Sequence, residues 1–273
     1  MCTEMIRERA VIALCGKGGV GKTSVSALLT RLLCRDPEAR VLAIDADPAV
    51  GLATALGIEV TKTIDDIRNS LIARVEKGTG GQKREILAHL DYEVFEALVE
   101  RDNLAFLAIG RPETEGCYCQ VNTFLKEIIE SISRGFDYVL IDGEAGIEQV
   151  NRRVMERVTH LLLVSDASAK GLNVIRTIKR VADGAVNYKR AGLLLNRLRD
   201  EVELSRLSLP GEIDFLGWLP EDLLLREYDI EGRSLMELPD CPALDAAEAI
   251  LTRLEMSPRG PHQHECRCGM QNS

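Results

Sequence analysis

The stretch that decides the fold is Cys15-Gly16-Lys17-Gly18-Gly19-Val20-Gly21-Lys22-Thr23-Ser24. An apolar run at residues 10–14 precedes it and predicts a buried strand, and apolar residues at helical spacing follow it over residues 25–33. A strand, a glycine-rich loop and a helix in this order are the context of a P-loop, whose backbone N–H groups surround phosphate oxygens at a helix N-terminus. We therefore predict a nucleotide-binding site formed by the residues from Gly16 to Ser24.

Two lysines lie in this loop. Lys22 stands where a P-loop lysine reaches the terminal phosphates, and the hydroxyl of the neighbouring Thr23 would hold Mg²⁺. Lys17 is an additional lysine near the start of the loop. The alternative interpretation is a glycine-rich turn with two solvated lysines, but the flanking strand and helix favour the P-loop.

Two further apolar strands are predicted to end in carboxylates. Residues 40–45 end in Asp45, with Asp47 two positions later, and residues 136–142 end in Asp142, which is a Walker B pattern. Ligands of an open parallel sheet bind beyond the carboxyl ends of its strands, so these carboxylates should face the nucleotide and its Mg²⁺. The alternative for Asp47 is an Asp-Pro turn that closes a strand.

Strand and helix patterns alternate along the rest of the chain. Strands are expected at 104–109, 161–165, 192–197 and 214–220, and helices after Cys119, at 168–181 and at 243–254. Residues 61–103 are charged and mostly helical in pattern, broken by glycines near 78–81, and a turn-like segment precedes the last helix. The sequence predicts an α/β fold, a doubly wound and mostly parallel sheet flanked by helices. Residues 1–256 would form one ATPase domain, and residues 257–273 a flexible tail.

The composition limits the classes of partner. The net charge is −9 and only 4% of residues are aromatic, which argues against nucleic acid as a partner. No apolar run approaches the roughly 20 residues that span a bilayer, and the N-terminus has no signal-peptide pattern. We therefore expect a cytoplasmic protein with no membrane contact.

The polar ends of the last two strands provide candidate contacts for adenine. Asn196 and Arg197 end one strand, and Pro220 ends the other. An amide can both donate to and accept from a base edge, so Asn196 suits the adenine-reading position. The alternatives are an amide that caps a strand and a proline that ends one.

Eight cysteines in a cytoplasmic protein indicate metal or redox chemistry rather than disulfides. Cys15 and Cys34 have apolar neighbours and are predicted core residues. Cys117 and Cys119 lie in a loop at a helix start, where the helix dipole favours the thiolate form. One chain offers two sulfurs, whereas a closed tetrahedral site needs four ligands, so a two-fold homodimer would complete it. The alternative is two free thiols in a surface loop.

A second group of possible ligands lies in the tail. In an extended segment, alternate side chains share one side, so four donors can converge on a metal ion. Imidazole and thiolate together suit Zn²⁺, Ni²⁺ or copper. The alternative is a disordered tail of accidental composition. These four donors are His262, His264, Cys266 and Cys268.

Taken together, these motifs resemble the CooC-type accessory ATPases, in the dimeric Min, Par and nitrogenase iron-protein group. The resemblance rests on the loop with Lys17, the Asp-x-Asp-Pro segment, Gly-Cys-Tyr-Cys before a helix, and Asp-Gly-Glu-Ala-Gly-Ile-Glu at residues 142–148. It implies that Lys17 crosses a dimer interface to the partner's phosphates, that Asp47 orients the attacking water, and that Asp45 supports Mg²⁺ through its waters. Gln149 stands where histidine is expected, and the family does not require the tail.

The resemblance implies an ATP-dependent maturation ATPase that dimerises on ATP and inserts nickel into apo carbon monoxide dehydrogenase or acetyl-CoA synthase. Its bound ligands would be ATP, Mg²⁺ and either Ni²⁺ or Zn²⁺. Three alternatives remain open. A partition or division-site ATPase would share the nucleotide site, an iron–sulfur electron carrier could hold a cluster on four thiolates across a dimer, and a metal reservoir would rest on the tail alone.

Overall fold

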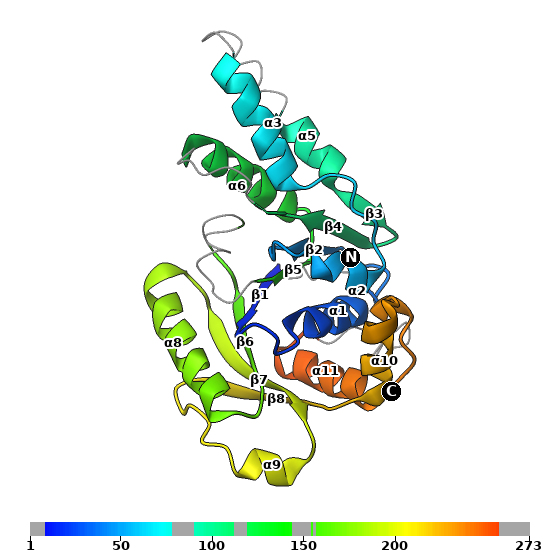
Figure 1. Ribbon diagram of the computed structural model, residues 1–273, viewed down its shortest axis with the longest axis vertical. Coiled ribbons are helices and arrows are strands. Elements are labelled where there is room, and N and C mark those ends of the chain that lie inside the picture. The colour runs from blue at the N-terminus through cyan, green and yellow to red at the C-terminus, as the bar shows by residue number, and fades with distance from the viewer. Residues whose placement is uncertain (1–8, 78–89, 112–118, 144–153, 155–156, 257–273) are drawn as a thin grey trace, which may run out of the picture.

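A single sheet runs through the computed structural model, which describes residues 9–77, 90–111, 119–143, 154 and 157–256 (Figure 1). The described strands pair in the order β3-β4-β2-β5-β1-β6-β7-β8. All neighbours are parallel except β3 and β4, which confirms the doubly wound, mostly parallel sheet. The strands are β1 Ala10–Gly16, β2 Val41–Asp45, β3 Val99–Arg101, β4 Leu104–Ala108, β5 Tyr138–Asp142, β6 His160–Ser165, β7 Arg190–Leu198 and β8 Asp214–Pro220.

Helices cover both faces of the sheet (Figure 1). One apolar cluster joins the sheet to α1 (Lys22–Leu33), α2 (Gly51–Leu56), the 3₁₀ turn Leu235–Glu237 and α11 (Pro242–Arg253), with α10 (Leu223–Glu231) at its margin. The other cluster joins it to α3 (Ile64–Lys77), α5 (Leu90–Ala97), α6 (Cys119–Ser133) and α8 (Ala169–Ala185). The short helix α9 (Glu201–Ser205) connects β7 to β8. Alternation along β1 divides the core, since Val11 and Ala13 belong to one cluster and Ile12 and Leu14 to the other.

The structure departs from the sequence prediction in two places. The charged segment 61–103 is not helical throughout, because Val99–Arg101 adds an antiparallel edge strand, followed by a turn in which Asp102 has φ 53°. The turn-like segment before the last helix contains α10, which the sequence analysis missed. Leu223 on α10 is 77% exposed, so the leucines that open the helix do not mark one buried face. The predicted glycine-rich break near 78–81 lies outside the described residues.

The sheet places the functional residues along one edge. β1 lies between β5 and β6, and the loop that follows β1 leads directly into α1. On the other side of β5, Asp45 of β2 is level with Asp142. The carboxyl ends of β1, β2 and β5 therefore meet where the sequence predicts the nucleotide. None of the helices that the structure describes is both long and apolar enough to cross a membrane.

The turn between β3 and β4 also fixes the connection from α1 to β2. The amide nitrogen of Asn103 lies 3.3, 2.8 and 2.9 Å from the carbonyl oxygens of Cys34, Asp36 and Ala39. The two N–H donors of this amide therefore serve the backbone carbonyls that precede β2, and those of Asp36 and Ala39 are the nearest.

We predict that Asn103→Asp lowers the free energy of unfolding by about 1–3 kcal/mol, because a carboxylate cannot donate to these carbonyls. Asn173→Asp is the matched control. The oxygen of the Asn173 amide accepts from Arg176 at 2.9 Å, and a carboxylate can do the same. Urea denaturation of both variants measures the difference, and equal midpoints would contradict the role given to Asn103.

Candidate functional site: a nucleotide cradle at the carboxyl edge of the sheet

The predicted P-loop begins at the end of β1 and closes around a buried lysine. Lys22 is 8% exposed, and its ammonium donates to the carbonyl of Lys17 at 3.3 Å. Gly21 precedes α1 with φ 86°, a left-handed conformation that a side chain would strain. The N–H groups of the first turn of α1 are therefore directed at the space that the loop encloses, together with the positive end of the helix dipole.

The end of β7 supports this loop from outside. Asn196 is 3% exposed, and its amide nitrogen donates to the carbonyl of Val20 at 2.9 Å while its oxygen accepts from the N–H of Arg197 at 3.0 Å. Arg197 has φ 61° and donates to the carbonyl of Gly19 at 3.4 Å. A Cβ on Gly21 would lie 2.4 Å from the Asn196 amide nitrogen, so glycine is required at this contact. Asn196 thus holds the P-loop, and its contact with adenine stays a prediction.

Asp142 is the Walker B carboxylate of the prediction, and the structure places it against α1. It is 1% exposed, and one of its oxygens, Oδ1, accepts from the hydroxyl of Ser26 at 3.0 Å. Thr23 also hydrogen-bonds its side chain. Burial raises the pKa of Asp142 to about 6, against the lowering effect of Thr23, Ser26 and Lys22. Ser26 was not predicted as a site residue. Its position one turn after Thr23, among apolar residues of the same helix, is a signal that indicates a buried hydroxyl near the Walker B carboxylate.

Asp45 lies beside Asp142 and is fully buried. Its oxygens accept from the N–H of Asp47 at 3.1 Å and from the N–H of Leu52 at 2.8 Å. Burial, followed by the charge of Asp142, raises the pKa of Asp45 to about 7. Asp47 is half-buried one step beyond the strand, where its carboxylate accepts from the N–H of Ala49 at 2.9 Å. The structure therefore brings all three predicted carboxylates to the same edge.

These side chains suit Mg²⁺. Within the part of the chain that the structure describes, the second carboxylate oxygen of Asp142 is buried and has no hydrogen-bond partner. An orphaned carboxylate oxygen, a neighbouring threonine hydroxyl and a second buried carboxylate form the hard oxygen donor set that Mg²⁺ prefers. Thr23, Asp45 and Asp142 would hold the ion, which when bound neutralises phosphate charge.

Lys17 reaches out of the loop toward β6. Its ammonium lies 4.0 Å from the carboxylate of Asp166, and both side chains are more than a third exposed. Asp166 also accepts from the hydroxyl of Ser168, which caps α8 by accepting from the N–H of Gly171. Asp166 follows the predicted strand 161–165 directly, and an acid at the end of a predicted strand is the signal that also identifies Asp45.

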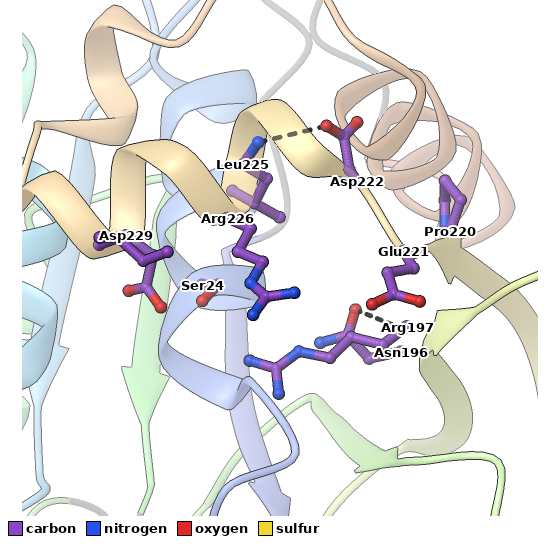
Figure 2. A pocket seen from close by; sticks show the side chains of 10 residues that line it. Ser24, Asn196, Arg197, Pro220, Glu221, Asp222, Leu225, Arg226 and Asp229 are labelled. Carbon is purple, nitrogen blue, oxygen red and sulfur yellow. Dashed lines mark hydrogen bonds between the residues drawn. The ribbon is translucent and has the colours of Figure 1, made fainter.

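A pocket of about 320 Å³ opens beside the P-loop, between α1 and α10 (Figure 2). Four of the predicted nucleotide-binding residues line it together, although they come from three separate segments of the chain. The remaining wall is formed by Glu221 and by α10 with its capping residue, Asp222. The four predicted residues are Ser24, Asn196, Arg197 and Pro220.

The predicted metal ligands fall largely outside the described residues. Cys119 is the first residue of α6, as the prediction of a cysteine loop at a helix start requires. Cys117, His262, His264, Cys266 and Cys268 all lie outside the described ranges. The described residues hold no group of three or more His, Cys, Asp or Glu side chains placed to bind a metal ion.

Two of the described cysteines, Cys15 and Cys34, pack against apolar residues. Cys15 is fully buried, which confirms its predicted core role, whereas Cys34 is half-buried and packs against the edge of an apolar cluster. Burial raises the pKa of each thiol to about 12. Neither is therefore a candidate thiolate ligand.

The carboxylate pair predicts a pH dependence for the protein free of nucleotide and Mg²⁺. Since the folded pKa values of Asp45 and Asp142 exceed the unfolded value of about 4, the folded state binds more protons between pH 4 and 7, and stability falls as the pH rises through this window. The free energy of unfolding of the wild type should fall between about pH 5 and pH 8, and in Asp142→Asn this fall should be smaller by about 2 kcal/mol. Denaturation of both proteins at both pH values measures the difference. Parallel wild-type and variant profiles would contradict the coupling.

Comparison with known proteins agrees with this geometry. The model of the family described as AAA domain matches residues 9–189. An uncharacterized ATP-binding protein of Methanocaldococcus jannaschii is 36% identical over 233 residues, which are 84% of this chain and 92% of that protein. The carbon monoxide dehydrogenase accessory protein CooC of Rhodospirillum rubrum is 30% identical over 254 residues, 89% of this chain and 95% of CooC.

Solved structures share the fold. The McdA–ATP complex of Cyanothece has a TM-score of 0.67 at 20% identity, covering 91% of this chain and 97% of that one. The septum site-determining protein MinD of Pyrococcus horikoshii, complexed with Mg-ADP, has a TM-score of 0.62 at 21% identity. The match covers 91% of this chain and 96% of that one. The chain belongs to the AAA domain family and is a P-loop ATPase of the group that includes CooC, MinD and ParA-type proteins.

Proposed function

We propose that this ATPase is a metallochaperone that inserts nickel into apo carbon monoxide dehydrogenase or acetyl-CoA synthase. One observation carries the proposal: Cys119 begins the helix that leaves the sheet at the same edge as the nucleotide carboxylates. α6 follows β4, whose last residue, Ala108, is level with Asp45, and Asp45 is level with Asp142. The likeness to CooC, over 95% of its length, supports the choice of client.

A series of hydrogen bonds joins the nucleotide edge to α6. The N–H of Ile109 donates to the carbonyl of Asp45 at 2.8 Å, and the carbonyl of Ile109 accepts from the N–H of Asp65 at 2.9 Å. Asp65 lies in the first turn of α3. From the next turn of α3, the guanidinium of Arg68, only 7% exposed, donates to the Asn122 amide of α6 at 2.9 Å. A displacement at Asp45 thus has a short packed route to the first turn of α6.

The proposed cycle depends on a homodimer. Each subunit would bind ATP in its own P-loop, and Lys17 would turn from Asp166 to the partner's γ-phosphate. Only a contact that ATP makes and ADP does not can favour the closed dimer, and Lys17 supplies this differential contact. Asp47 is placed beyond the strand end, where it would orient the attacking water. Loss of the γ-phosphate then removes the contact and opens the dimer.

Closure would assemble the metal site. Cys117 and Cys119 of both subunits supply four thiolates, the ligand set of a closed tetrahedral site for Zn²⁺ and a suitable one for Ni²⁺. The N-terminus of α6 favours the ionised sulfurs. Opening would separate the pairs, weaken the site and release the ion to the client. The tail residues His262, His264, Cys266 and Cys268 would form a separate reserve of ligands.

We predict that Cys117→Ala/Cys119→Ala removes the nickel or zinc that binds only in the presence of a non-hydrolysable ATP analogue. Elemental analysis of the gel-filtered full-length protein measures it. Cys34→Ala is the matched control, because burial raises the pKa of that thiol to about 12 and it should hold no metal. Cys266→Ala/Cys268→Ala should leave the ATP-dependent metal in place.

Metal retained at unchanged affinity by the Cys117/Cys119 variant would reject the site. The second candidate, a partition or division-site ATPase, would then stand, favoured by the structural likeness to MinD. Co-sedimentation with DNA and with liposomes would test it, because such an ATPase must bind one of the two surfaces.

The two P-loop lysines should separate binding from dimerisation. Lys22→Gln should abolish nucleotide binding, since this buried ammonium lies inside the loop. Lys17→Gln should bind ADP within about threefold of wild type, yet lose ATP-dependent dimerisation and at least about a hundredfold in hydrolysis rate, as expected for a charge supplied across an interface. Light scattering and phosphate release measure both. A Lys17→Gln protein that dimerises normally would contradict the cycle.

A further inference from the structure

The pocket beside the P-loop contains an arginine side chain, Arg226, in addition to Arg197. Arg226, on α10, is exposed and lines the pocket together with Ser24, which lies in the first turn of α1. Figure 2 shows the Arg226 side chain extending from α10 toward α1. Within the described part of the chain, its guanidinium takes part in no hydrogen bond or ion pair.

Among the described residues, no acidic group of the pocket forms an ion pair with this arginine. Asp222 caps α10 and accepts from the backbone N–H groups of Leu224, Leu225 and Ala243 at 2.9–3.2 Å. The carboxylate of Glu221 lies 4.0 Å from the guanidinium of Arg199, a residue that does not line the pocket. Asp229 lies one turn along α10 from Arg226, and no ion pair within 4.0 Å joins the two among the described residues.

The pocket therefore presents two guanidinium groups, and among the described residues neither has a carboxylate within 4.0 Å, although three carboxylates also line the pocket. Arg197 already donates to the carbonyl of Gly19, so its position is fixed by the P-loop, whereas Arg226 is available. A planar guanidinium with unused donors matches phosphate oxygens, which it can bind with two parallel hydrogen bonds. The pocket chemistry points to an anionic group between α1 and α10.

The position of Ser24 identifies the anion. In a P-loop, Lys22 and Thr23 would reach the terminal phosphates, and the pocket wall of Asn196 and Pro220 is the predicted base end. The phosphate next to the ribose must lie between these two ends, at the first turn of α1. We propose that Arg226 binds the α-phosphate of the nucleotide and thereby fastens α10 to α1 in both the ATP and the ADP state.

A contact with the α-phosphate has a specific signature, because ADP and ATP share this group and adenosine lacks it. Arg226→Gln should weaken ADP binding by about tenfold and raise the KM for ATP by a similar factor, as expected for a lost charged hydrogen bond at a partly exposed site. Adenosine should displace a fluorescent ADP analogue equally well from variant and wild type. Arg226→Lys should recover part of the affinity, since it keeps the charge without the planar fork.

The salt dependence of ADP binding gives a readout that a purely structural role would not change. Affinity should fall less steeply with added KCl in Arg226→Gln than in wild type or Arg226→Lys, because one screened charge contact is gone. Glu227→Gln, the next residue on α10 and outside the pocket lining, is the control and should match wild type in every measurement. ADP affinity within twofold of wild type in Arg226→Gln, or an equal loss for adenosine, would overturn the proposal.

Discussion

The site depends on two carboxylates that are buried side by side. Asp45 and Asp142 end adjacent parallel strands in register, so the sheet fixes their separation and neither can turn to solvent. A buried charge costs several kcal/mol unless it is paired, and here each carboxylate also opposes the other. Protonation relieves this cost in the absence of a cation, and a divalent cation would relieve it when nucleotide is bound. The same arrangement should therefore favour the site with its cation over the site without it.

A second constraint concerns the P-loop carbonyls. A loop that directs its N–H groups inward must direct carbonyls elsewhere, and each outward carbonyl needs a donor. Three side chains supply donors: Lys22, inside the loop, for the carbonyl of Lys17, and Arg197 and Asn196, outside it, for the carbonyls of Gly19 and Val20. Asn196 and Arg197 belong to the end of β7, and they lie 176 and 178 residues along the chain from the loop residues whose carbonyls they contact. Anion binding at the loop is thus a property of the whole sheet edge and not of the glycine motif alone.

The sequence was sufficient to predict the strands that carry the site, because apolar runs that end in Asp45 and Asp142 report both burial and the polar edge. It could not assign the amide of Asn196, since local sequence does not reveal that Val20 lies within reach. α10 was missed because its first leucine is exposed, so hydrophobic periodicity failed there. Its start and end signals, Asp222 and the left-handed Gly232, were present and carried the information that periodicity lacked.

The order of strands limits where a nucleotide-controlled metal site could be built. β2 and β5 carry the paired carboxylates, and the crossover that contains Cys119 begins at β4, beside β2, and ends in β5. α6 is therefore attached at one end to a strand level with Asp45 and at the other to the strand that ends in Asp142. A cysteine pair on the β7–β8 side would share no strand with these carboxylates. Because the sheet interior is closely packed, we expect a change at the carboxylates to act on this crossover, which would carry the proposed thiols that respond to the γ-phosphate.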